Sequence, residues 1–196
     1  MLAGPRVANS NSLRIIGGTW RSRRLKFIDS PKIRPTPDRV RETLFNWLAA
    51  NINGATCLDL FAGSGALGFE AMSRGADQVV LVEEDARIAA MLNEQIELFN
   101  AQAIEIKNQN ALTYLQNVNQ QYDVIFLDPP FDCDLLEKVI PMILKQQVLS
   151  VGGLLYVESA AQQKAIKCLE KSLETLNCIR EKISGEVRYA LYESDL

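Results

Sequence analysis

Apolar positions along the middle of the chain alternate between two spacings. Short runs rich in β-branched residues predict strands, and the apolar residues three or four positions apart between these runs predict helices. The expected strands are Thr56–Leu60, Gln78–Val82, Ile104–Lys107, Tyr122–Leu127 and Leu154–Glu158, and the expected helices are Ala66–Ser73, Asp85–Phe99, Ala111–Gln116 and Asp134–Leu149. This alternation predicts a doubly wound α/β fold, a mostly parallel sheet with helices on both faces.

The C-terminal part departs from that alternation. A further helix is expected over Gln162–Leu173, followed by two adjacent strands, Leu176–Ile183 and Val187–Tyr192. Ser184-Gly185 between the two strands is a turn signal. The pair therefore predicts a hairpin that closes one edge of the sheet.

The N-terminal part precedes the α/β pattern. Residues 1–12 predict a flexible tail, and Leu13–Ile28, broken by Gly17-Gly18, predicts a strand–turn–strand hairpin. Thr36 is expected to cap a helix with Pro37 at its first position, ending near Asn51–Gly54. The interpretation is a tail (1–12), a hairpin and loop extension (13–35) and one α/β domain (36–196).

Composition excludes several kinds of chemistry. The chain has 196 residues, of which 47% are hydrophobic and 23% charged, as in an ordinary globular protein. It has no histidine, which excludes Ser-His-Asp triads, histidine bases and histidine-ligated zinc. Its four cysteines form no C-x-x-C pair, so we expect reduced thiols and no metal. With no long apolar run and a polar N-terminus, a cytoplasmic protein without membrane contact is expected.

Charge is distributed unevenly along the chain. Residues 1–45 hold ten Lys or Arg against three acidic residues, whereas the rest holds 11 against 21. A basic segment on an acidic body favours contact with a polyanion such as nucleic acid, although a solvated arm without a specific partner is the alternative. The cluster Arg21, Arg23, Arg24 and Lys26 lies at or after the hairpin turn, where long basic side chains can reach phosphates.

A glycine-rich segment joins the first strand of the α/β pattern to its helix. Gly63, Gly65 and Gly68 allow a sharp turn and a close ligand approach, and Glu83, at the end of the next strand, can accept the hydroxyls of a ribose. The spacing fits both a nicotinamide site and an S-adenosylmethionine (SAM) site. Asp59, four residues before the first glycine, favours SAM, as does the lack of an evident dehydrogenase group. A tight turn without a ligand is the structural alternative.

Two further segments follow strands at the same sheet edge. Asn110-Ala111 can contact an adenine edge, cap a helix, or do both. Asp128-Pro129-Pro130-Phe131 is rigid because proline fixes φ and restricts the preceding residue. The carboxylate and the Pro129 carbonyl can accept two N–H bonds from an exocyclic amine, and Phe131 can stack on its base. This favours methylation of an amine, while a simple strand stop is the alternative.

These motifs carry a family resemblance over most of the chain. Asp59-Leu-Phe-Ala-Gly-Ser-Gly, Glu83 and Asp128-Pro-Pro-Phe resemble a class I SAM-dependent methyltransferase. Arg14-Ile-Ile-Gly-Gly-Thr-Trp-Arg-Ser-Arg-Arg-Leu and Arg34-Pro-Thr-Pro-Asp-Arg-Val-Arg-Glu-Thr-Leu-Phe-Asn-Trp-Leu are similar to the RsmD family. That family comprises bacterial 16S ribosomal RNA guanine-N2 methyltransferases.

The resemblance implies fold, chemistry and site residues. The implied fold is a Rossmann-like seven-stranded sheet with a reversed edge strand. The implied cofactor is SAM, which is converted to S-adenosylhomocysteine (SAH), and the implied target is guanine 966. The resemblance also implies that the protein is a monomer and that its partner is the 30S ribosomal subunit. Asp128, Pro129, Pro130 and Phe131 would be catalytic. The cofactor-binding residues would be Asp59, Phe61, Gly63, Gly65, Glu83, Asn110, Ala111, Thr36 and Arg39. The RNA-binding residues would be Arg14, Arg21, Arg23, Arg24, Lys26 and Arg34.

Three alternatives stay open at this point. Another amino methyltransferase could act on adenine N6 or on a protein glutamine amide, although such enzymes usually carry Asn-Pro-Pro-Tyr. A nicotinamide oxidoreductase would use the glycines but gives Asp128-Pro-Pro-Phe no role. A non-catalytic RNA-binding assembly factor would retain the pocket without transferring a methyl group.

Overall fold

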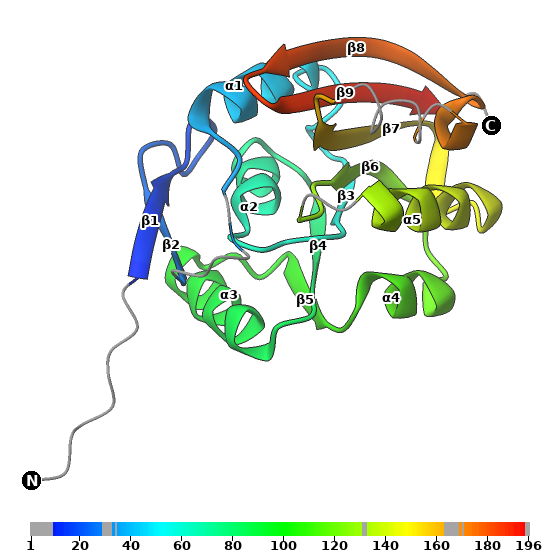
Figure 1. Ribbon diagram of the computed structural model, residues 1–196. Helices are drawn as coiled ribbons and strands as arrows, with labels where there is room; N and C mark the ends of the chain where they lie inside the picture. Colours follow the sequence, from blue (N-terminus) through cyan, green and yellow to red (C-terminus); the bar gives the residue numbers. More distant parts are fainter. Residues whose placement is uncertain are drawn as a thin grey trace, which may run out of the picture.

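The computed structural model describes residues 10–28, 33, 35–130, 133–162, 169 and 171–194. Seven strands form one sheet in the order β5-β4-β3-β6-β7-β9-β8 (Figure 1). Its strands are β3 (Thr56–Asp59), β4 (Gln78–Glu83), β5 (Ile104–Asn108), β6 (Tyr122–Leu127), β7 (Leu149–Ala160), β8 (Leu176–Ser184) and β9 (Val187–Ser194). The expected Rossmann-like architecture is confirmed.

Strand direction divides this sheet into two parts. β3 pairs in parallel with β4 and β6, β4 pairs in parallel with β5, and β6 pairs in parallel with β7. β9 runs antiparallel to both β7 and β8, so the reversed strand is not the edge strand, as was expected, but lies one position inside the edge that β8 forms. Parallel strands end at a common sheet edge, and that edge holds the site described below.

Helices cover both faces of the sheet. α1 (Asp38–Trp47), α2 (Ala66–Ser73) and α3 (Ala86–Phe99) contribute apolar residues to one buried cluster. α4 (Ala111–Asn117) and α5 (Cys133–Lys145) contribute to the cluster on the opposite face. The sheet is therefore the middle layer of three. The helix expected over Gln162–Leu173 lies largely outside the described residues.

Two helices have different ends from those expected. α5 stops at Lys145 because Gln147 takes a left-handed φ of +53° and the Val148 N–H turns back to the Ile143 carbonyl, which caps the helix. The expected helical residues 148–149 instead lead into β7. α1 ends at Trp47, before the expected Asn51–Gly54, and its N-cap is Pro37 without a side-chain hydrogen bond. Thr36 is not the cap, because its hydroxyl points to Asp128.

A two-stranded antiparallel hairpin of β1 (Ser10–Arg14) and β2 (Arg24–Ile28) lies against α3. Leu13, Ile15, Leu25 and Phe27 are buried in the same cluster as the core side chains of α1 to α3. The hairpin expected from the sequence is thus present, but its first strand begins at Ser10, inside the segment expected to be a flexible tail, because residues 10–12 pair with β2. Its apolar face is continuous with the core of the sheet.

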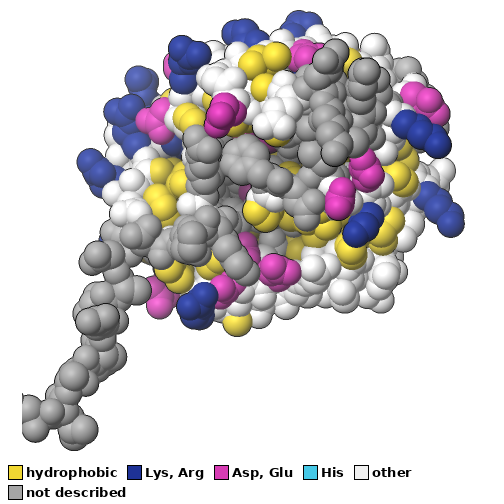
Figure 2. All heavy atoms as spheres, viewed as in Figure 1, with side chains coloured by type: hydrophobic (Ala, Val, Ile, Leu, Met, Phe, Trp, Pro, Cys, Tyr) yellow, Lys and Arg dark blue, Asp and Glu magenta, His cyan; other side chains and the backbone are white. Residues whose placement is uncertain are grey.

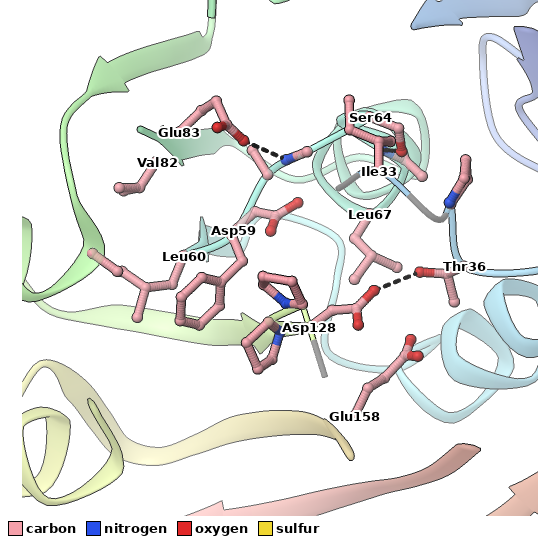
Figure 3. A pocket seen from close by; sticks show the side chains of 18 of the residues that line it. Ile33, Thr36, Asp59, Leu60, Ser64, Leu67, Val82, Glu83, Asp128 and Glu158 are labelled. Atoms are coloured by element: carbon pink, nitrogen blue, oxygen red, sulfur yellow. Dashed lines mark hydrogen bonds between the residues drawn. The ribbon is translucent and has the colours of Figure 1, made fainter. Parts of the chain in front are cut away.

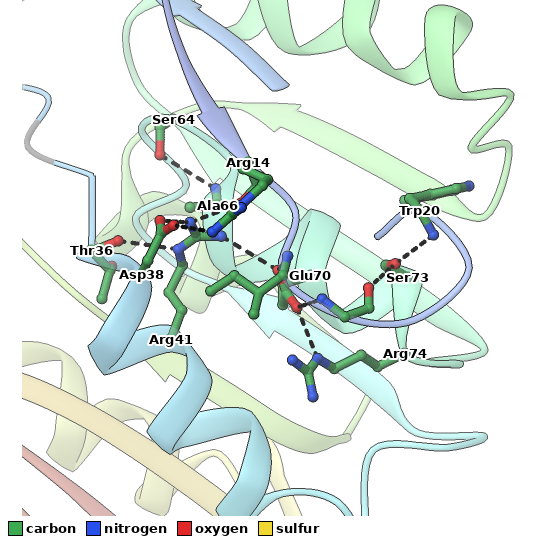
Figure 4. A network of polar contacts seen from close by, with 12 residues as sticks. Arg14, Trp20, Thr36, Asp38, Arg41, Ser64, Ala66, Glu70, Ser73 and Arg74 are labelled. Atoms are coloured by element: carbon green, nitrogen blue, oxygen red, sulfur yellow. Dashed lines mark hydrogen bonds and ion pairs between the residues drawn. The ribbon is translucent and has the colours of Figure 1, made fainter. Parts of the chain in front are cut away.

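The hairpin is also attached by a buried carboxylate. Glu70 of α2 is fully buried and accepts hydrogen bonds from the backbone N–H groups of Ile16 and Gly17, each at 2.8 Å (Figure 4). Two arginines form ion pairs with the same carboxylate: Arg74 at 2.8 Å and the buried Arg41 at 3.4 Å. We call Glu70 with these four partners the Glu70 network. Arg41 also donates to the carbonyls of Arg14 and Thr36, which links the network to the loop before α1.

Candidate active site

A cavity of about 540 Å³ opens at the carboxyl ends of the parallel strands. Its lining comes from the loops after β3, β4, β5 and β6, from the loop before α1, and from residues 184–187 at the β8–β9 turn. Ligands of open α/β sheets bind at this edge, near the point where the strand order reverses. β3 and β6 flank that point here.

Four carboxylates from four neighbouring strands line this cavity. Glu83 ends β4, Asp59 ends β3, Asp128 follows β6 directly, and Glu158 lies near the end of β7. β4, β3, β6 and β7 are consecutive in the sheet, so these side chains form a row, which we call the carboxylate row. Figure 3 shows Asp59, Asp128 and Glu158 directed toward one shared space.

Asp59 is buried without full compensation. It is 1% exposed, its Oδ2 accepts the Gly68 N–H at 3.3 Å, and its Oδ1 has no hydrogen-bond partner among the described residues. Burial, reinforced by the nearby Asp128 carboxylate, raises the pKa of Asp59 to about 7. An unpaired buried carboxylate oxygen is unfavourable unless a ligand supplies a donor or a positive charge.

The glycine turn and Glu83 hold each other in place. Gly63 has φ of +49°, and its N–H donates to Glu83 Oε2 at 2.9 Å, while the Asp85 N–H donates to Oε1 at 2.8 Å. The Glu83 carboxylate is therefore oriented and keeps lone pairs free for hydroxyl groups. Burial raises its pKa above the usual value.

Gly65 has a structural rather than a lining role. Its φ of +76° places it at the N-cap of α2, and a Cβ there would lie 2.7 Å from Leu92 Cδ2. Among the described cavity residues Gly65 is absent, whereas Phe61, Ala62 and Gly63 are present. This glycine allows the turn that brings its neighbours to the cavity.

Asn110 caps α4, and it also lines the cavity with Ala111. Asn110 Oδ1 accepts the Leu112 N–H at 2.9 Å, and its amide nitrogen lies 3.2 Å from Glu84 Oε2. The capping alternative is therefore correct, and the side chain still borders the cavity.

Asp128 is positioned by its proline loop and by Thr36. Pro129 is buried, and the Thr36 hydroxyl donates to Asp128 Oδ2 at 3.0 Å. Burial raises the pKa of Asp128 to about 6, and the Thr36 hydrogen bond opposes that rise. Asp128, Pro129 and Pro130 all line the cavity, whereas Phe131 lies outside the described residues.

Glu158 belongs to the site but was missed from the sequence. It is 7% exposed, and Tyr156 on the same strand donates its hydroxyl to Oε1 at 2.7 Å. Burial and the neighbouring Asp128 raise the pKa of Glu158 to about 8. In sequence Glu158 is only the end of an expected strand, and its place beside Asp128 depends on the pairing of β6 with β7.

The predicted basic residues lie away from the carboxylate row. Arg23 lies 3.9 Å from the centre of the Phe99 ring and donates to the Leu98 carbonyl, and Arg24 donates to the Ser12 hydroxyl. Arg14 lies 3.5 Å from Asp38. The Arg21 and Lys26 side chains make no hydrogen bond or ion pair within the described parts of the chain, and Arg34 lies outside them.

Arg39 does not line the cavity among the described residues. It lies on α1, where its guanidinium is 3.4 Å from the Ser184 hydroxyl, so it connects that helix to the β8–β9 turn. Figure 2 shows Lys and Arg side chains along the edge that carries β1, β2 and α1 and also along the top and the right-hand side of the same face, while acidic side chains border its central part.

The described residues show neither a metal-binding cluster nor a membrane-spanning helix. They contain no cluster of three or more His, Cys, Asp or Glu side chains arranged to hold a metal ion. None of their helices is long and apolar enough to cross a membrane.

Comparison with known proteins finds similarity along nearly the whole chain. The family model "Conserved hypothetical protein 95" matches residues 13–193. "Ribosomal RNA small subunit methyltransferase D" of Escherichia coli K12 is 42% identical over 195 residues, covering 97% of this chain and 94% of that protein.

Solved structures show the same fold. The structure described as "Putative methyltransferase yhhF from Escherichia coli" is 39% identical, with a TM-score of 0.83, covering 95% of this chain and 99% of the other. A structure described as "a putative methyltransferase complexed with SAH" is 18% identical, with a TM-score of 0.75, covering 98% and 58%. At that identity the second likeness shows the fold alone.

Proposed function

The chain belongs to the family described as Conserved hypothetical protein 95, and on that premise we propose that it transfers a methyl group from SAM to the N2 amine of a guanine in 16S ribosomal RNA. The observation that carries the proposal is Asp128, held by Thr36 beside Asp59 and Glu83 in one cavity. The relative named as a ribosomal RNA small subunit methyltransferase supports the substrate class. Guanine 966 is the position we propose by family resemblance.

The residues of the cavity fit SAM. Asp59 Oδ1 has no hydrogen-bond partner among the described residues, so a ligand that brings a donor or a positive charge would stabilise it. The backbone at Gly63 leaves open space beside the Glu83 carboxylate, which can accept hydrogen bonds from ribose hydroxyls. When bound, SAM supplies a methyl group on a positively charged sulfur. Asp59 and Glu83 would hold its polar groups, and Phe61, Asn110 and Ala111 would surround its base.

Asp128 and the Pro129 carbonyl would hold the target amine. An exocyclic amine is a weak nucleophile because its lone pair is delocalised into the ring. Two acceptors on its N–H groups would direct the lone pair toward the methyl group, so that the rate gain comes from positioning and charge. A carboxyl with a pKa of about 6 is mostly ionised at neutral pH, and Asp128 can take the proton that the amine loses.

The remaining parts of the proposal concern partner and context. By family resemblance, we propose that a monomer is the working unit. We propose the 30S subunit as the partner, contacted through the exposed Arg21 and Lys26 of the hairpin region, which implies a cytoplasmic enzyme. The domain division into residues 1–12, 13–35 and 36–196 stays a prediction.

The test combines labelling with a matched pair of variants. Purified protein, methyl-labelled SAM and 30S particles from cells lacking this activity are incubated, and the labelled nucleotide is mapped. We expect label on one guanine N2, lost by about 10²-fold or more in Asp128→Ala. Asp77→Ala is the matched control, because Asp77 is exposed before β4, at the opposite sheet edge. Label on adenine N6, or on protein, would replace the proposed substrate.

A further inference from the structure

Glu158 lies beside Asp128 because of the register between β6 and β7. Leu127 pairs with Val157 in the parallel ladder, so the next residue on each strand is Asp128 and Glu158. Neighbouring strands lie about 4.8 Å apart, which places the two residues side by side at the cavity. Figure 3 shows both carboxyl groups directed toward Thr36 and the shared space.

Glu158 has a fixed orientation and no basic partner. Tyr156 holds one of its oxygens at 2.7 Å, and no Lys or Arg forms an ion pair with it among the described residues. The groups that face it are Asp128 after β6, Asp59 on β3, Thr36 before α1 and Tyr156 on its own strand. Tyr189 of β9 is its antiparallel pairing partner. A buried acid without a cation is unfavourable for folding, so this position is not explained by stability.

Guanine offers an edge that matches two adjacent acceptors. Its N2 amine and its N1–H are neighbouring donors, whereas adenine has an unprotonated N1 next to its amine. Resting on the function proposed above, we propose that Glu158 is a specificity-determining residue that accepts the N1–H of the target guanine while Asp128 accepts an N–H of its N2 amine. Adenine would place a lone pair against Glu158 and lose that hydrogen bond.

The protonation state of the pair is compatible with this role. Two adjacent carboxyls repel when both are ionised, and the raised pKa of Glu158 shows that it keeps its proton more readily than Asp128. An N1–H donor favours the ionised form of Glu158, because only the neutral form has an O–H that could pair with adenine N1. Asp128, whose pKa is the lower of the two, is ionised at neutral pH and remains the acceptor of the amine proton.

The test uses a base that keeps the amine and lacks the neighbouring donor. 30S particles are reconstituted with 16S RNA that carries either guanine or 2-aminopurine at the target position. The ratio of single-turnover rates, guanine over 2-aminopurine, is measured for the wild type and for Glu158→Ala. 2-Aminopurine also lacks O6, but this loss affects both proteins and cancels when the two ratios are compared.

We expect the variant to lose about tenfold to a hundredfold of the wild-type discrimination, as for a hydrogen bond to a charged group. Tyr156→Phe, which removes the hydroxyl on Glu158, should give an intermediate ratio. Glu174→Gln, an exposed position, is the control and should keep the wild-type ratio. Where methylation of 2-aminopurine is undetectable, the affinities of that RNA and of guanine RNA for each protein are measured, and the ratio of the two dissociation constants is compared between the wild type and Glu158→Ala.

The two proposals fail in different ways. Equal ratios in the wild type and Glu158→Ala, with guanine methylated by the wild type, would overturn the role of Glu158 and leave the methyltransferase intact. No methylation of guanine RNA by the wild type would overturn both. Melting temperature and SAM binding of Glu158→Ala are measured alongside, because a change in the ratio of two substrates does not follow from a general loss of folded protein.

Discussion

Glu70 and the carboxylate row differ in how the surrounding residues compensate their negative charge. Glu70 is fully buried and receives donors from two backbone N–H groups and two arginines. Asp59 is buried to the same degree, yet one of its oxygens has no partner among the described residues. The hydrogen bonds and ion pairs of Glu70 all come from this chain, whereas in the carboxylate row Asp59 keeps an unpaired oxygen that a ligand can satisfy.

This difference distinguishes acidic residues that stabilise the fold from acidic residues that are candidates for ligand binding. Burying a carboxylate is unfavourable unless hydrogen bonds and cations compensate it. Glu70 meets that condition by joining α2, α1 and the hairpin. Asp59, Asp128 and Glu158 form no ion pair within the described residues, Asp59 also has one oxygen without a hydrogen bond, and all three have raised pKa values. Polar groups left unsatisfied in a cavity are candidates for function.

The largest effect is expected from breaking the Glu70 network. Glu70→Ala leaves Arg41 buried without its carboxylate and removes the acceptor for Ile16 and Gly17. We expect a loss of about 3–5 kcal/mol in the free energy of unfolding, measured by urea denaturation. Glu97→Ala, exposed on α3, is the control. A loss below about 1 kcal/mol would show that the network is not needed for the fold.

The carboxylate row should respond in the opposite direction. Asp59→Asn removes a buried charge that lacks full compensation. We expect the ligand-free protein to be as stable as the wild type or more so, while SAM affinity falls by about tenfold to a hundredfold, as for a lost hydrogen bond to a charged group. Denaturation and calorimetric titration measure the two effects. If Asp59→Asn destabilised the protein without changing its affinity for SAM, Asp59 would have a structural role and not a role in binding SAM.

The pH dependence of stability sharpens the comparison further. Because the pKa values of Asp59 and Glu158 are raised in the folded protein to about 7 and about 8, the folded state binds more protons than the unfolded chain above pH 4. Their contribution is fully present below the unfolded pKa values, near 4, and is lost as pH rises through about 7 to 8. We expect a loss on the order of 1–3 kcal/mol between pH 5 and pH 8.5 without ligand.

The control for that experiment is the double variant Asp59→Asn/Glu158→Gln. Its stability, measured by denaturation at each pH, should change less than that of the wild type over this range. An equally steep decline in the double variant would place the titrating groups elsewhere.

The smallest effects concern two arginines of the hairpin region. Arg23 stacks on Phe99 and donates to the Leu98 carbonyl, so Arg23→Ala should cost about 0.5–1 kcal/mol of stability. Arg21 has no such contacts within the described residues, and Arg21→Ala should leave stability within about 0.5 kcal/mol. In RNA binding we expect Arg21→Ala to reduce the slope of log affinity against log salt by about one. Equal slopes for wild type and Arg21→Ala would remove Arg21 from the RNA contacts.

The sequence predicted those parts of the fold and the site that depend on local order. A strand, a turn and a second strand in succession were enough to predict Asp59, Gly63 and Glu83 as site residues. A strand that ends in two prolines was enough to predict Asp128. The reversed strand could be expected from the hairpin signal at Ser184-Gly185. These features need no information from distant segments.

The parts that the sequence did not reveal depend on distant partners. Glu158 becomes a site residue only because β7 pairs with β6. Glu70 is one helical position among many until the backbone of Ile16 and Gly17, more than 50 residues earlier, reaches it. Thr36 has the features of a helix cap, yet its hydroxyl bonds Asp128, 92 residues later. Local propensity cannot distinguish these uses of the same side chain.

Arg41 has a consequence for protein engineering. One guanidinium contacts the hairpin backbone at Arg14, the carboxylate of Glu70 and the carbonyl of Thr36, whose hydroxyl in turn bonds Asp128. The hairpin is therefore not a detachable module that can be truncated or grafted onto another enzyme with the remainder unaffected. A shortened chain that begins after the hairpin would expose apolar core and disturb the loop that orients Asp128. The smallest autonomous version of this protein includes its N-terminal strands.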